Sequence, residues 1–155
     1  MPSVNAVGVI PRRGPNMDAS AQAFRWTEQY SVHIDELDRQ HQWLFATINE
    51  LNEALSSGQG AAVTHSVLQK LVQYALTHFA AEEKLMEQHS FPGLQRHKTE
   101  HHKFAEDLAK FEADFDNKKS GVPVALLFFL DHWLKHHILT TDKEYSSYLN
   151  EHGVR

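Results

Sequence analysis

Histidine is the residue type that stands out in this sequence. The chain of 155 residues contains 12 histidines and no cysteine. Five of these histidines lie at helical spacing between apolar residues: His41, His78, His97, His101 and His137. Imidazole nitrogens are common ligands of transition metals, often together with carboxylate oxygens. The absence of cysteine excludes disulfides, iron–sulfur clusters, thiolate zinc sites and cysteine nucleophiles. These five residues are therefore candidate ligands in a metal site built from nitrogen and oxygen atoms.

Two acidic residues accompany the histidines. Glu82 follows His78 by four residues and should share its face, because such residues lie about 40° apart on an α-helix. Asp142 follows His137 by five residues, which corresponds to about 140° on a regular α-helix. If Asp142 is a ligand, the helix must widen, so we predict a π-type turn or bend between His137 and Asp142. The same helical geometry predicts that the side chain of Glu83 points away from His78, towards solvent.

Each part of this pattern also has a simpler explanation. A single histidine on an apolar face, such as His41, is more often a hydrogen-bonded core residue than a ligand. A His–Glu pair at i, i+4 is often a surface pair. Four helices that bring polar groups to one interior without a partner would, however, lose several kcal/mol to desolvation. Five imidazoles and a glutamate exceed a tetrahedral zinc site, so the set favours iron or manganese, as a pair.

The other seven histidines are expected at edges or in solvent. His132 and His136 form a second i, i+4 pair, but the helical wheel places them about 140° and 100° from His137. We therefore interpret both as solvated. The remaining five are His33, His65, His89, His102 and His152.

Four helices are predicted to position the candidate ligands. They cover about residues 35–56, 61–89, 94–118 and 123–150, with glycine and proline between the patterns. Short connections favour an all-α, up-down-up-down antiparallel four-helix bundle over residues 23–155. Residues 1–22 are expected to form a flexible N-terminal tail.

No apolar run approaches the roughly 18 residues of a membrane span, and no signal peptide is evident. The net charge of −5 argues against nucleic-acid binding, and we expect a cytoplasmic protein.

The ordered set of candidate ligands resembles that of the hemerythrins. It reads His41, His78-x-x-x-Glu82, His97-x-x-x-His101 and His137-x-x-x-x-Asp142. The surrounding residues are similar to the bacterial members, over about residues 24–149: Trp26, Tyr30, Asp38-Arg-Gln-His41, Leu44-Phe45, His78-Phe79, Glu82-Glu83, Trp133-Leu134 and His137-Ile138. The sequence departs from them in its N-terminal extension and in His33, where bacterial members often have glycine.

The resemblance implies two non-haem iron ions. His97, His101 and His137 would bind one iron, and His41 and His78 the other. Glu82 and Asp142 would bridge both, together with an oxo or hydroxo group. If both irons are six-coordinate, these ligands fill every coordination position except one. The open position lies on the iron with two histidines, as expected for a reversible dioxygen site.

The resemblance also implies an apolar wall that keeps water from this position, formed by Leu44, Trp133, Leu134 and Ile138. Ordinary core packing explains Trp133 and Leu134 equally well. The expected function is oxygen transport, storage, buffering or sensing. We expect dioxygen as the ligand, an oxygen-consuming protein as its recipient, and a monomer without membrane insertion.

Two other function classes remain as alternatives. A di-iron oxidase or peroxidase of the ferritin-like type uses paired Glu-x-x-His motifs, which this sequence lacks; its nearest match is Asp38-x-x-His41. The histidine-rich set therefore favours a binding protein over an enzyme. An iron-handling regulatory module would carry a signalling domain or a cysteine-bearing segment, and neither fits this sequence. We therefore expect a stand-alone oxygen binder.

Overall fold

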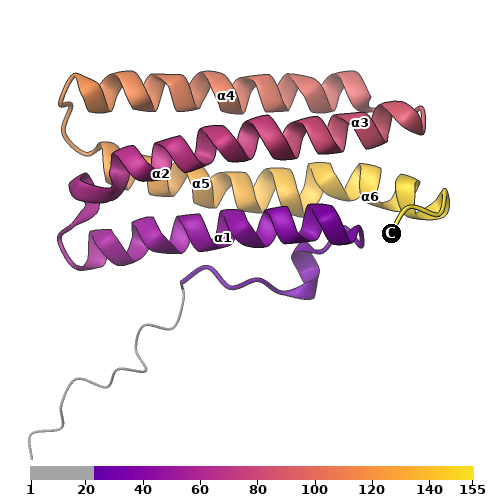
Figure 1. Cartoon of the computed structure of the whole chain (residues 1–155), viewed down its shortest axis with the longest axis horizontal. Helices are drawn as coiled ribbons and strands as arrows, with labels where there is room; N and C mark the ends of the chain where they lie inside the picture. Colours follow the sequence, from indigo (N-terminus) through magenta and orange to yellow (C-terminus); the bar gives the residue numbers. More distant parts are fainter. Residues whose placement is uncertain (1–22) are drawn as a thin grey trace, which may run out of the picture.

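The structure is built from four rods of helix that lie side by side, and successive rods run in opposite directions (Figure 1). It is a computed structural model that describes residues 23–155, so the tail expected at residues 1–22 lies outside the described part. The first rod is α1 (Asp35–Ser56), and the third is α4 (Leu94–Asp116). The second and fourth rods are each interrupted by a π-helical segment. They comprise α2 (Gly60–Tyr74), η3 (Ala75–Phe79) and α3 (Ala80–Gln88), and α5 (Val122–Trp133), η4 (Leu134–Thr141) and α6 (Asp142–Glu151).

This arrangement confirms the predicted four-helix bundle. The limits of the four rods lie within two residues of the predicted ones, because the helix-ending residues are explicit in the sequence. Gly58 and Gly121 adopt the left-handed conformation that favours glycine, with φ of 74° and 78°. Pro123 lies in the first turn of α5, where its missing N–H costs no hydrogen bond. A single-turn 3₁₀-helix, η2 (Glu28–Tyr30), precedes the bundle.

The predicted widening before Asp142 is present as η4, which ends at Thr141. A second π-helical segment, η3, surrounds His78 and was not predicted.

His33, which stands where bacterial members of the family often have glycine, has an unusual backbone conformation. His33 has φ of 55°, a left-handed conformation in which glycine is the least strained residue. No helix in residues 23–155 is long and apolar enough to cross a membrane.

Two apolar clusters fill the bundle, and the candidate ligands lie between them. On α1, Leu37 belongs to the smaller cluster and Leu44 to the larger, with His41 between. The second rod repeats this order, because Glu82 lies between Phe79 of the larger cluster and Met86 of the smaller. The candidate ligands therefore occupy a buried layer that is sealed by apolar side chains at both ends.

Candidate metal centre

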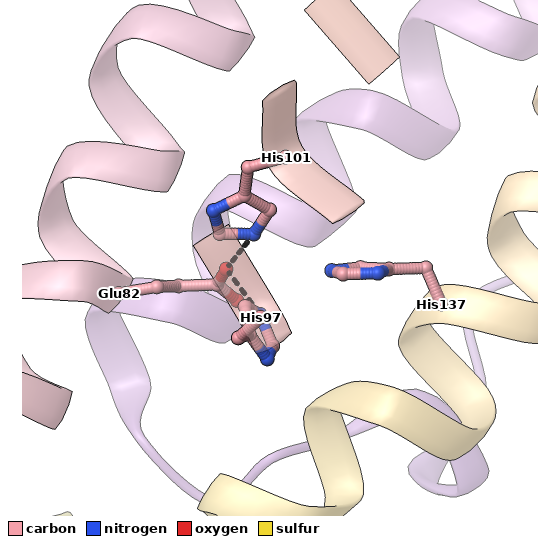
Figure 2. Close-up of side chains that lie close together, drawn as sticks. All are labelled: Glu82, His97, His101 and His137. Carbon is pink, nitrogen blue, oxygen red and sulfur yellow. Dashed lines mark ion pairs between the residues drawn. The ribbon is translucent and has the colours of Figure 1, made fainter. Parts of the chain in front are cut away.

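Glu82, His97, His101 and His137 come together from three rods and point at one another (Figure 2). All four are buried, and one ligand atom from each lies within 4.8 Å of the others. Glu82 Oε2 is 3.0 Å from His101 Nε2 and 3.4 Å from His97 Nε2. Three imidazoles and a carboxylate thus face a common space of the size that a metal ion occupies.

A second group shares Glu82 with the first. It consists of His41, His78, Glu82 and Asp142, which are all buried and also place one ligand atom each within 4.8 Å. Glu82 Oε1 lies 3.0 Å from His78 Nε2 and 3.7 Å from His41 Nε2. The structure therefore brings together all seven residues singled out in the sequence, as two adjoining groups.

Many polar atoms of this layer have no hydrogen bond within the protein. Of ten buried side-chain polar atoms without a hydrogen bond in the described residues, eight belong to the two groups. They include His137 Nε2 and both carboxylate oxygens of Asp142. Leaving such atoms unpaired in an apolar interior is costly, and a bound cation would satisfy them. The residues present thus fit a metal centre with nitrogen and oxygen ligands.

Charge within the layer supports the same fit. Burial would lower the pKa of His97, but the adjacent carboxylates of Asp142 and Glu82 outweigh it and raise that pKa to about 10. Burial is likewise outweighed for His137, where Asp142 raises the pKa to about 9. Both carboxylates have a pKa well below the usual range, because the histidines outweigh the opposing effect of burial. In the metal-free protein, protonated His97 and His137 therefore balance the charge of the two carboxylates. A metal cation would take over this role, so metal binding must release protons.

Three of the five histidines have a hydrogen-bond partner on the ring nitrogen that faces away from the centre. His78 Nδ1 is 2.7 Å from Gln40 Oε1, His101 Nδ1 is 2.8 Å from Glu83 Oε1, and His137 Nδ1 is 2.7 Å from Glu100 Oε2. Such partners fix the tautomer that leaves Nε2 free to bind a metal. The expectation that Glu83 faces solvent was wrong, because α4 lies over this side of α3 and offers His101.

Parallel aromatic rings cover the same three histidines. Phe79 stacks on His101 with centroids 3.7 Å apart, and Trp133 stacks on His137 at 3.8 Å. Tyr74 stacks on His78 at 4.7 Å. Sequence reasoning named Trp133 but missed Phe79 and Tyr74 as neighbours of the candidate ligands. The stacking restricts ring rotation, so these residues help to hold the imidazoles in place.

One further polar residue contacts the centre directly. The hydroxyl of Tyr145 donates a hydrogen bond of 2.5 Å to Glu82 Oε1, and the side chain is fully buried. Burial, with the charges of Asp142 and Glu82, raises the pKa of Tyr145 well above its usual range, so the hydroxyl remains a donor. Nothing in the sequence indicates this contact beyond the helical phase of Tyr145.

Removing the carboxylate of Glu100 tests the outer partners. Because Glu100 orients His137 and increases its basicity, Glu100→Ala should weaken metal binding by about 10–100-fold. Competition with a calibrated chelator would measure this affinity. Glu106→Ala is a matched control, since Glu106 lies exposed on the same helix. Equal affinities in both variants would show that the hydrogen bond to His137 has no role in holding the metal.

Comparison with known proteins agrees with this architecture. The family model described as the hemerythrin HHE cation binding domain matches residues 32–149. The chain is 33% identical over 129 residues to bacteriohemerythrin of Stenotrophomonas maltophilia, covering 82% of each protein. It is 32% identical over 126 residues to a hemerythrin-like protein of Naegleria gruberi, covering 81% of this chain and 93% of that protein. A crystal structure of a hemerythrin variant matches with a TM-score of 0.74 at 26% identity, covering 83% of this chain and 98% of that one. Since the family model spans nearly the whole bundle and all the candidate ligands, this chain belongs to the hemerythrin family.

Proposed function

We propose that this protein binds dioxygen reversibly at a pair of non-haem iron ions, with residues 23–155 as the binding domain. The observation that carries the proposal is the way both carboxylates divide their oxygens between two sets of histidines. Glu82 turns Oε1 towards His78 and Oε2 towards His101. Asp142 turns Oδ2 towards His41 at 3.3 Å and Oδ1 towards His137 at 3.0 Å. Carboxylates arranged in this way are suited to bridging two metal ions.

The proposed ligand sets follow from this division. His97, His101 and His137 would hold one iron, and His41 and His78 the other. Glu82 and Asp142 would bridge them, together with an oxo or hydroxo group. Mixed imidazole and carboxylate donors suit iron, and the larger number of imidazoles distinguishes the set from carboxylate-rich sites that activate oxygen. The iron pair, when bound, supplies reversible dioxygen binding through its change between ferrous and ferric states.

The task of the surrounding residues is to keep water out. Leu44, Leu134 and Ile138 are almost completely buried, and Trp133 closes the layer beside His137. An apolar wall offers no hydrogen-bond partners, so water is not held there. Exclusion of water protects a bound ligand from displacement and the metal from irreversible oxidation. We propose these four side chains as the wall of the oxygen pocket, and an oxygen-consuming protein as the recipient.

Truncating this wall should shorten the life of the oxygen-bound state. In Ile138→Ala the free energy of unfolding should fall by about 2–5 kcal/mol, as for other buried aliphatic truncations. The irreversible oxidation measured after oxygen addition should also become faster, because water reaches the centre. Ile48→Ala is the matched control, since Ile48 is equally buried but lies two turns of α1 away from His41. If both variants oxidise at the same rate, Ile138 has no protective role.

Optical spectroscopy through repeated oxygen cycles tests the proposed function. Anaerobically reduced, iron-loaded protein should gain a visible absorption band when oxygen is added and lose it when oxygen is removed, over several cycles. Oxygen uptake should stop at one molecule per chain. Continued oxygen consumption in the presence of a reductant, or bleaching at first exposure, would instead indicate an oxidase or peroxidase.

A further inference from the structure

A second group of histidines lies outside the buried centre. His132, near the end of α5, and His136, in η4, are both exposed and lie on the same face. Their rings stack with centroids 4.0 Å apart and an angle of 27° between planes. Among histidines outside the centre, residues 23–155 contain one other ring pair, His89 and His152, and these are 6.4 Å apart.

The pair lies at the edge of a surface groove between α4 and the fourth rod. Glu100, Lys103 and Asp107 line the groove from α4, and His132, His136 and the outer face of His137 line it from the other side. Each lysine near the pair contacts a carboxylate. Lys103 contacts Asp107 at 3.2 Å, an aspartate that Lys110 also contacts, and Lys135 contacts Asp131 at 2.8 Å. These carboxylates weaken the electrostatic repulsion that a cation at the two imidazoles would meet.

We propose that His132 and His136 form a surface site for a divalent transition-metal ion, separate from the buried centre. Two histidines at i, i+4 on one helical face present their ring nitrogens to the same point, as in helical zinc sites. Imidazole binds Zn²⁺, Ni²⁺, Cu²⁺ and Fe²⁺, and water completes the coordination of an exposed ion. Because the side chains are exposed, small rotations from the stacked arrangement direct one nitrogen of each ring to the metal.

Titration of iron-loaded protein with nickel chloride, followed by calorimetry, tests this site. The wild-type chain should bind one nickel ion that the double variant His132→Gln, His136→Gln does not bind. Either single variant should bind it about a hundredfold more weakly, because the second imidazole acts at a high effective concentration. The matched control is the double variant His65→Gln, His102→Gln, which removes two exposed histidines that are not neighbours. It should keep the wild-type affinity.

Equal nickel binding by the wild type and the His132→Gln, His136→Gln variant would overturn the proposal. A loss of nickel binding in the His65→Gln, His102→Gln variant would overturn it as well. The surface site is independent of the proposed oxygen function. Iron content is measured in the same samples, and it should be unchanged in every variant because none of these residues faces the buried centre. A failure of the iron centre would therefore appear in the iron content, and a failure of the surface site only in the nickel titration.

Discussion

Replacing Glu82 with glutamine should abolish metal binding at both proposed iron positions at once. Glu82 belongs to both groups of ligand atoms, and its two oxygens face different histidines. Glutamine has the same size but no negative charge, and its amide nitrogen cannot act as a ligand. The variant therefore removes a proposed bridging ligand and half of the carboxylate charge of the layer, while the packing of the bundle is retained.

Metal content after reconstitution with ferrous iron would measure this effect. Glu87→Gln is the matched control, because Glu87 is exposed on the same helix and should leave the iron content unchanged. Circular dichroism of both variants should show the same helix content. If Glu82→Gln retains one iron, Glu82 binds only one of the ions and does not bridge. If it retains two, Glu82 is not a required ligand.

Removing iron with a chelator should lower the melting temperature of the protein by roughly 10 °C. A ligand that binds only the folded state adds about 4 kcal/mol at a concentration a thousand times its Kd. For a chain of this length, 1 kcal/mol corresponds to about 2–4 °C. The physical source of the effect is the buried layer itself. Without metal, its carboxylates and imidazoles remain desolvated, with eight polar atoms unpaired.

Differential scanning calorimetry of iron-loaded and iron-free protein would measure this shift. The Glu82→Gln variant provides an internal control, since it should melt at one temperature whether or not iron is added. A wild-type melting temperature that does not depend on iron would show that the polar layer is stable on its own. The unpaired atoms would then not indicate a metal centre.

The sequence predicted the bundle and the residues of the polar layer more completely than it predicted their surroundings. The phase of a helix is set by its own sequence, so the inward positions of His41, His97 and His101 follow from spacing alone. The wide turn before Asp142 was predicted because five-residue spacing cannot place both groups on one face of a regular helix. The η3 segment was missed because His78 and Glu82, four residues apart, require no such widening.

The partners that surround the layer depend on how the helices pack together. A helical wheel gives the direction of Glu83 about its own axis, but not that α4 would cover this direction and offer His101 Nδ1. Glu100 and Gln40 likewise act on histidines of other rods, at sequence separations of 37 and 38 residues. Contacts of this kind require the relative rotation of neighbouring rods, which one sequence does not specify.

The most direct test of the proposed centre is the amount and kind of metal bound to each chain. Protein purified or reconstituted with iron should contain two iron ions per chain by elemental analysis, with Mössbauer spectra of two coupled, inequivalent sites in the oxidised state. The inequivalence is expected because three histidines face one position and two face the other. One metal ion per chain, or zinc in place of iron after reconstitution in the presence of both, would contradict a paired iron centre.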